Sequence, residues 1–251
     1  MTRRVVALAG GLSVAPGRRV AYGPLVTYAH WPLFDLRLTS ADLTLRPMTE
    51  ADLATMAGLL PADLEQDPGA TRFAVGDEPL SRGMVLHQAY WRAFGTWRPE
   101  AWRLGFAVSA GGEIIGFQEL QGDDFPVLRT VDSSSFLIES ARGRGYGKQM
   151  RRAVLALAFG PLGAQAAVTS AWQDNHASLG VSRALGYRWN GENLHAHGDR
   201  VDVMVSMRLQ RSDWLAGRGA DGIEIGGFEP CRPLFGLDGG EPALAMPRDR
   251  P

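Results

Sequence analysis

A glycine-rich stretch holds the residue types that most directly indicate chemistry. It consists of Arg142, Gly143, Arg144, Gly145, Tyr146, Gly147 and Lys148. The chain before it has the pattern of a strand, and the chain after it has the pattern of a helix. Glycines at such a junction let the backbone turn tightly and leave its N–H groups uncovered, and the helix adds the positive end of its dipole. The stretch therefore predicts a turn that binds phosphate.

The spacing of the glycines separates three kinds of phosphate-binding turn. A Walker loop needs four residues between its first glycine and its Gly-Lys pair, and Ser or Thr after that pair, but Arg142 and Gln149 occupy those two positions. A dinucleotide-binding fingerprint needs two residues between its second and third glycines, whereas the glycines here are evenly spaced. The pattern that remains is Arg-x-x-Gly-x-Gly, formed by Arg142, Gly145 and Gly147.

A second motif follows after one predicted helix and one predicted strand. Asn175 and Ser178 give Asn-x-x-Ser, and residues 185–187 read Leu-Gly-Tyr. In this order and spacing, the two motifs resemble the signatures of the GNAT superfamily of N-acetyltransferases, and together they are more specific than either alone. The resemblance covers residues 36–214, and residues 43–53 resemble the entry of the RimJ/RimL-like branch, which acetylates protein N-termini or small amines.

The resemblance implies a fold and a cofactor. The fold is a mixed α/β sheet in a single domain, whose fourth and fifth strands splay apart; these strands correspond here to residues 130–138 and 166–172. The pantetheine arm of acetyl-CoA would lie in the gap and pair with free backbone groups of the fourth strand. The implied cofactor-binding residues are Phe136, Leu137, Ile138, the seven residues of the glycine-rich stretch, Asn175 and Ser178.

Transfer of an acyl group from a thioester to an amine makes three demands. The developing oxyanion needs a donor, for which a backbone N–H near Leu137 or Ile138 is expected. The leaving thiolate needs a proton, and the resemblance implies Ser178, although a serine at a helix start can instead cap the helix. Asp174 or Asn175 is better placed as the cap by sequence.

The amine must also lose a proton, and Glu119 is the first candidate for the acceptor. The competing interpretation is that Glu119 is a solvated strand residue beside Gln118. Other candidates in the same part of the chain are Asp123, Asp124, Glu139 and His176.

The periodicity of the sequence predicts the elements that position these residues. A capping box formed by Thr49 and Asp52 starts the first helix. Arg142, Arg144 and Lys148 either add direct charge to the diphosphate or, together with Arg151 and Arg152, only form a solvated basic flank of a later helix. Trp172, Tyr187 and Trp189 line a substrate pocket or lie in the core. The predicted strands are 36–39, 43–46, 104–108, 114–120, 130–138, 166–172, 187–189 and 201–209, and the predicted helices follow residue 49 and span 85–94, 147–159 and 177–185.

Composition limits the class of protein. The 251 residues are 45% hydrophobic and 21% charged, which is typical of a soluble globular protein. A net charge of −1 provides no strong field for nucleic acid or an anionic membrane. The single Cys231 excludes an intramolecular disulfide and a Cys-rich zinc site, so a cytoplasmic location and no metal are expected.

The organisation follows from where periodicity begins and ends. We expect an N-terminal extension at 1–35, one acetyltransferase domain at 36–214 and a C-terminal extension at 215–251. Arg3 and Arg4 with a short apolar run weakly resemble a secretory signal, but glycine and proline end that run early, which favours a flexible tail.

The sequence therefore predicts an acetyl-CoA-dependent N-acetyltransferase that transfers the acetyl group directly. The acceptor is a small amine or a protein N-terminus, and the near-neutral charge does not discriminate between them. A small amine is slightly favoured, because a ribosomal-protein target would more often be matched by strong charge. A homodimer is compatible with the sequence. The alternatives are an acyl-CoA-binding sensor or scaffold without turnover, and a nucleotide-binding fold.

Overall fold

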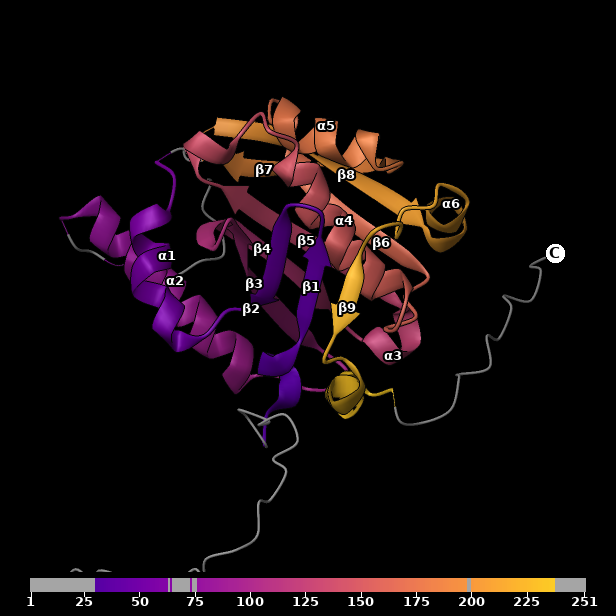
Figure 1. The fold of residues 1–251 in the computed structure, drawn as a ribbon. Helices are drawn as coiled ribbons and strands as arrows, with labels where there is room; N and C mark the ends of the chain where they lie inside the picture. Colours follow the sequence, from indigo (N-terminus) through magenta and orange to yellow (C-terminus); the bar gives the residue numbers. More distant parts are fainter. Residues whose placement is uncertain (1–29, 63, 65–72, 74–75, 198–199, 238–251) are drawn as a thin grey trace, which may run out of the picture.

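The fold is built on one open sheet (Figure 1). The structure is a computed structural model that describes residues 30–62, 64, 73, 76–197 and 200–237, so the weak signal-like segment lies outside the described residues. Within these ranges the strands are arranged in the order β7-β8-β6-β5-β4-β3-β2-β1-β9. They are β1 (Arg37–Ser40), β2 (Leu43–Pro47), β3 (Trp102–Ala110), β4 (Glu113–Gly122), β5 (Thr130–Leu137), β6 (Ala166–Trp172), β7 (Arg188–His197), β8 (Arg200–Gln210) and β9 (Glu224–Gly226).

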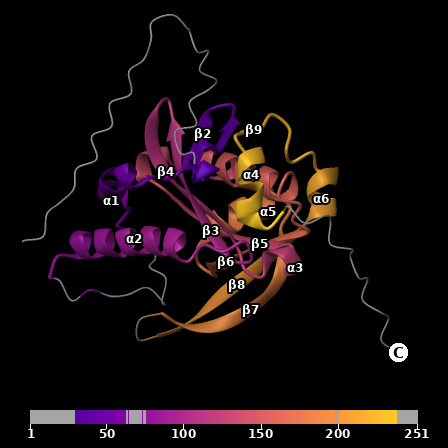
Figure 2. The same ribbon diagram turned by 90° about the horizontal axis from the view of Figure 1, so that it is seen from below.

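Helices flank the sheet on both faces. Figures 1 and 2 show α4 and α5 over one face and α1 and α2 beside the other. The helices are α1 (Leu53–Leu59), α2 (Glu78–Gly95), α3 (Phe125–Leu128), α4 (Tyr146–Phe159), α5 (His176–Ala184) and α6 (Arg211–Ala216), with 3-10 turns η1 (Pro32–Asp35), η2 (Glu50–Asp52), η3 (Glu139–Ala141) and η4 (Glu229–Phe235). No helix in the described part of the chain is long and apolar enough to span a bilayer.

Strand alternation creates two apolar layers. Phe106 of β3 packs with α4, whose Val154 and Leu157 are fully buried. The next strand residue, Ala107, belongs to a smaller cluster with Leu53 and Met56 of α1. Because successive side chains of a strand point to opposite faces, the two clusters lie on opposite sides of the sheet. This arrangement confirms the predicted mixed α/β architecture.

The predicted start of the first helix is confirmed. The backbone N–H and the hydroxyl of Thr49 donate to Asp52 Oδ2 at 2.7 and 2.8 Å. Arg46 of β2 forms a two-pronged ion pair with the same carboxylate, with both N–O distances at 2.7 Å. Burial by itself raises the pKa of Asp52, but the bonds from Arg46 and Thr49 outweigh it and set this pKa to about 2.

The sheet opens between β5 and β6, its only parallel pair among the described strands. These strands pair from Thr130 with Ala166 as far as Asp132 with Val168. Beyond that point β5 follows β4 and β6 follows β8 to their own ends. The splay between the predicted fourth and fifth strands is therefore confirmed, and its closed end is the Asp132–Val168 pair.

The described part of the C-terminal extension wraps the domain. Its strand β9 pairs antiparallel with β1 and adds an edge to the sheet. Phe228, Cys231 and Phe235 are buried in the same apolar cluster as α4, and Trp97 Nε1 donates to Leu234 O at 2.8 Å. The domain boundaries at residues 35 and 214 stay predictions.

Candidate active site

The glycine-rich stretch leads from β5 into α4, as predicted: residues 142–145 precede the helix, and residues 146–148 form its first turn. Gly143 and Gly145 have φ angles of +74° and +81°, which favour glycine, and Gly145 caps α4. The helical ladder begins where Gln149 N donates to Gly145 O at 3.2 Å, so the N–H groups before it lack a partner in the helix. A Cβ at Gly143 or Gly145 would meet no atom within 4 Å. The turn thus offers backbone donors toward open space, which suits a phosphate group.

The charged side chains of the turn have local partners as well. Arg142 Nε donates to Leu137 O at 3.1 Å and braces the turn against the end of β5. The Arg144 guanidinium lies over the Tyr146 ring, 5.1 Å from its centroid. Lys148 is exposed.

The edge of β5 that faces the gap carries free backbone groups. Ile138 N donates to Ile115 O at 3.0 Å, so this N–H is not available to a ligand. Thr169 Oγ1 of β6 donates to Ser133 O at 3.1 Å, which shows that Ser133 faces the gap. Because backbone groups alternate in direction along a strand, the N–H groups of Ser135 and Leu137 face the gap too. Neither has a strand partner there, since pairing with β6 has ended.

The second motif forms the start of α5. Asn175 caps this helix, because its Oδ1 accepts from Ser178 N at 3.0 Å. The half-buried Ser178 hydroxyl has no hydrogen-bond partner among the residues that the structure places. Val181, one turn later, lies 3.5 Å from where a Cβ of Gly147 would be. The two motifs are therefore neighbours at the open end of the gap.

Glu119 lies on the other face of the sheet. It shares a face of β4 with Phe117, two residues earlier, whose ring stacks on Phe136 at 5.9 Å between centroids in the α1 layer. Its carboxylate is 3.9 Å from Arg103 Nη1, and its side chain is 23% exposed. Arg103 also borders a hollow of about 520 Å³ with Asp123 and the end of α2. Glu119 is thus separated from Ser178 by the sheet.

The expectation that Arg151 lies on a solvated flank is wrong. Its side chain is 3% exposed, and it shares an inward stripe of α4 with Met150, Val154 and Leu155. Arg152 points away, where its guanidinium donates to Gly219 O and Asp221 O at 3.1 and 3.0 Å. The stripe at helical spacing is the sequence signal that would have identified Arg151 as buried.

The aromatic residues near the motifs divide between core and surface. Trp172 and Tyr187 are 3% and 4% exposed, whereas Trp189 is 68% exposed. Burial raises the pKa of Tyr187, although the neighbouring Arg151 guanidinium opposes the rise. Tyr187 is therefore a core residue that packs in the same apolar cluster as α4.

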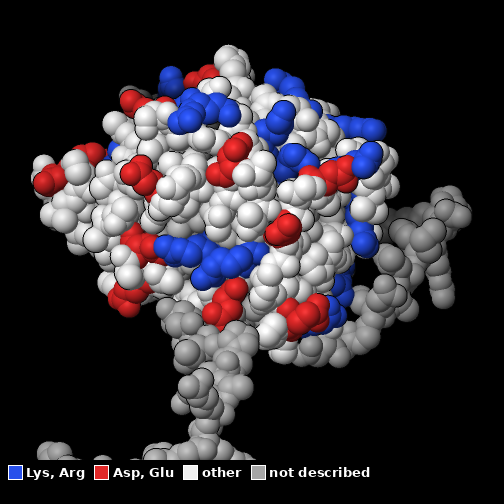
Figure 3. Space-filling view, viewed as in Figure 1, with Lys and Arg blue, Asp and Glu red and all other residues white. Residues whose placement is uncertain are grey.

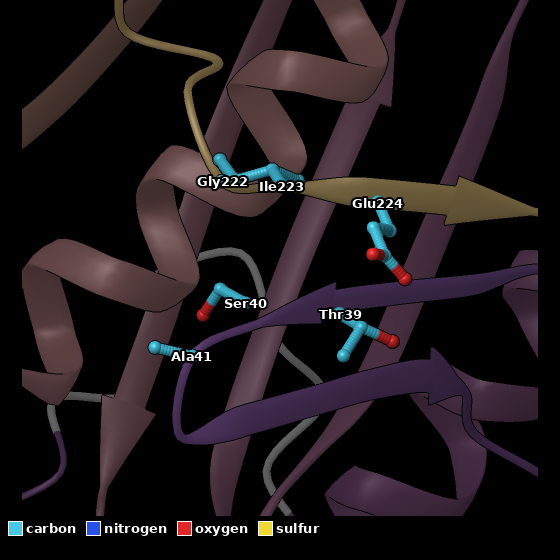
Figure 4. A pocket seen from close by; sticks show the side chains of 6 residues that line it. All are labelled: Thr39, Ser40, Ala41, Gly222, Ile223 and Glu224. Atoms are coloured by element: carbon cyan, nitrogen blue, oxygen red, sulfur yellow. The ribbon is translucent and has the colours of Figure 1, made fainter.

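Other surface features lie outside the motifs. A hollow of about 460 Å³ separates the β1–β2 turn from the segment that leads into β9 (Figure 4). Its lining residues are Thr39, Ser40, Ala41, Gly222, Ile223 and Glu224. Basic and acidic side chains are interspersed on the face shown in Figure 3. In the described ranges, no three His, Cys, Asp or Glu side chains gather as a metal site would require.

Comparisons with known proteins agree with this geometry. A family model described as an acetyltransferase (GNAT) domain matches residues 42–188. A chimera of Vibrio cholerae spermidine N-acetyltransferase SpeG and hSSAT is 16% identical, covers 70% of this chain and 99% of its own, and gives a TM-score of 0.54. The dodecameric Vibrio cholerae spermidine N-acetyltransferase is also 16% identical, with coverages of 69% and 96% and a TM-score of 0.54. At these identities the solved structures show the shared fold, and the family model shows that the chain belongs to the GNAT acetyltransferase family.

Proposed function

We propose that this protein is an acetyl-CoA-dependent N-acetyltransferase. The observation that carries the proposal is the free edge of β5, which runs from the closed end of the gap to a glycine turn at the start of α4. A long ligand with a phosphate at one end and amide groups along its arm suits that arrangement. Acetyl-CoA has this form, and when bound it supplies the acetyl group as a thioester.

Different residues around the gap would bind different parts of such a ligand. The N–H groups of the turn, from Gly143 to Lys148, would hold the diphosphate. Leu137 N–H would bind the pantetheine arm at the open end, and the Asn175 side-chain amide, whose oxygen caps α5, would donate to it. Arg142 would keep the end of β5 in place through its bond to Leu137 O.

Three groups would perform the transfer. Glu119 accepts a proton from the amine, directly or through water, on the α1 side of the sheet. The amine nitrogen then bonds to the carbonyl carbon, and Ser135 N–H, which faces the gap, donates to the oxygen as its negative charge develops. The C–S bond breaks with its electron pair on sulfur, the nitrogen releases its remaining extra proton to water, and Ser178 donates its hydroxyl proton to the sulfur. The Ser178 hydroxyl regains a proton from water.

Direct attack by the amine fits the position of the chain's one thiol. Cys231 is fully buried, and its Sγ donates to Gly227 O at 3.2 Å. Burial, together with the charge of Asp35, raises the pKa of Cys231 to about 11. A buried, protonated thiol is a poor nucleophile. The proposed reaction therefore has no covalent acyl-enzyme step.

We infer that the acceptor is a primary amine, with a small molecule favoured over a protein N-terminus. The net charge of −1 and the mixed basic and acidic side chains on the face shown in Figure 3 provide no strong field for a basic protein target. The solved structures of similar fold are named as acetyltransferases of spermidine, which is a small amine. The RimJ/RimL-like branch and a homodimer stay predictions from the sequence.

The proposal is tested by following thiol release from acetyl-CoA against a panel of amines. The panel contains polyamines, amino acids and short peptides with free N-termini, and the control omits the amine to measure hydrolysis. Calorimetry measures the affinity for CoA in parallel. We expect tight CoA binding and thiol release that depends on an amine.

Two outcomes would contradict this function. Binding of CoA without thiol release for every amine would favour a sensor or scaffold. Tighter binding of ATP or NAD than of CoA would favour a nucleotide-binding fold.

A further inference from the structure

Arg151 carries a buried charge that no carboxylate neutralises at close range. Its side chain is 3% exposed. Among the residues that the structure describes, no carboxylate oxygen of Asp or Glu lies within 4.0 Å of a guanidinium nitrogen, the distance that an ion pair requires. Burying an unpaired charge is strongly unfavourable, so such a group calls for a specific reason.

The guanidinium lies between the two strands just above the closed end of the gap. Its Nη1 is 3.4 Å from Thr169 Oγ1 of β6, and its Nη2 is 3.5 Å from Ser135 Oγ of β5. The last paired residues of those strands are Val168 and Asp132. The positive charge is thus held where the two strands separate, next to the closed end of the gap.

The surroundings are polar and incompletely bonded. Four buried side-chain atoms there make no hydrogen bond of ordinary geometry among the described residues, although the Tyr187 hydroxyl lies close enough to Ser133 and Arg151 to interact with both; the four are Gln118 Oε1, Ser133 Oγ, Arg151 Nε and the Tyr187 hydroxyl oxygen. Buried polar atoms are normally satisfied, and exceptions point to a functional reason. If Arg151 only kept the two strands apart, an apolar residue of similar length would serve better, because its burial would not cost the free energy of desolvating a charge.

We propose that Arg151 is a charge-supplying residue of the acetyl transfer, whose guanidinium stabilises the negative charge on the CoA sulfur as the C–S bond breaks. The inference rests on the proposed function. The arm enters at the open end of the gap, beside the diphosphate turn and Ser178, and runs along the free edge of β5, which brings its sulfur to the level of Ser135, between Ser178 and Arg151. Arg151 transfers no proton; Ser178 donates the proton, and Arg151 provides the fixed charge.

Other ionisable groups also contribute to the field at the closed end. Asp132 of β5 feels both Arg151 and Arg103, and Tyr187 packs behind Ser133. Glu119 and Arg103 form their pair on the opposite face. The test must therefore change Arg151 alone and leave the others in place.

The inference is tested on the binary complex with CoA, by following the ultraviolet absorbance of the thiolate as the pH rises. The complex with S-methyl-CoA is the blank, because it has no titrating thiol. In Arg151→Met we expect the bound thiol to titrate about one pH unit higher than in wild type, as loss of one nearby opposite charge requires. Arg151→Lys keeps the charge and should titrate close to wild type.

Arg152→Met is the matched control, since Arg152 is the next residue of α4 and faces away. It should leave the thiol unchanged. Turnover of acetyl-CoA should fall about ten-fold in Arg151→Met with little change in CoA affinity, because one pH unit corresponds to that factor. If Arg151→Met does not fold, Arg151→Gln replaces it.

Equal thiol titration in wild type and the neutral variant would overturn the inference and leave the proposed function intact. Failure of wild-type protein to bind CoA would overturn both.

Discussion

Ser178 is the residue whose role differs most between the two interpretations of its motif. The cap of α5 is Asn175, so the Ser178 hydroxyl is not needed to satisfy the start of the helix. Ser178→Ala should therefore lower kcat for acetyl-CoA by about 10²-fold, because the leaving sulfur loses its donor. CoA affinity from calorimetry should change little.

The matched control is Ser182→Ala, one turn further along α5. Its hydroxyl donates to Ser178 O at 3.1 Å, so this variant removes a backbone contact of the same helix without touching the gap. A kcat for Ser178→Ala that equals that of Ser182→Ala would show that Ser178 is structural.

Asp52 gives a residue-scale prediction about acid stability. Its pKa is about 2 in the folded chain against 3.8 for the unperturbed carboxyl. A lowered folded pKa stabilises the protein above pH 4, and this contribution is lost as the pH falls from about 4 to 2. Asp52→Asn should cost about 2 kcal/mol at neutral pH and flatten the pH dependence in that window.

Urea unfolding between pH 2 and pH 7 measures both effects. The control is Asp221→Asn, which breaks an exposed pair with Arg218 and should matter little. The assignment fails if both variants lose the same stability at neutral pH.

At the scale of elements, a substitution in the turn between β5 and α4 should weaken CoA binding by more than backbone strain alone explains. Gly145→Val should abolish CoA binding, because the valine side chain fills the open space where a diphosphate would approach the N–H groups. Valine at φ +81° also strains the backbone, by about 1–3 kcal/mol. Calorimetry with CoA measures the binding.

Gly111→Val controls for the strain. Gly111 has φ +58° on the β3–β4 turn, and its added Cβ would also meet no atom within 4 Å. It should lose similar stability but keep CoA affinity. Wild-type affinity in Gly145→Val would remove the turn from the site.

The sequence predicts the individual helices and strands well, and it predicts poorly where β5 and β6 stop pairing. The glycine turn, α4, β6 and α5 follow from spacing, because each signal lies within a few residues. The exit of β6 from β5 after Val168 depends on pairing across distant residues, so the resemblance supplied the splay. Arg151 was assigned to solvent by its charge, although its position on the apolar stripe of α4 required burial.

At the scale of the molecule, the C-terminal segment shows the same limit. Residues 215–237 are rich in glycine and proline and have little periodicity, which predicted an extension. Their contribution to the core comes from single aromatic residues in η4 and from three residues of β9 paired with β1. Such contacts have no period, and a scan for helices and strands does not find them.

Phe235 tests whether this segment belongs to the cooperative core. Its ring is fully buried, 4.9 Å from the Trp102 ring and 5.5 Å from the Trp97 ring between centroids. Phe235→Ala should lower the free energy of unfolding by about 3–5 kcal/mol, because the cavity adds to the lost burial. In a chain of this size that lowers Tm by about 10 °C.

Thermal and urea unfolding measure the change, and Leu215→Ala, which truncates an exposed side chain just before the segment, should stay close to wild type. CoA affinity below the unfolding transition should be retained, since no residue of η4 belongs to the proposed site. A single transition shifted as a whole would mean that the segment unfolds with the sheet. An unshifted main transition would mean that the wrapping segment contributes nothing to the stability of the acetyltransferase domain.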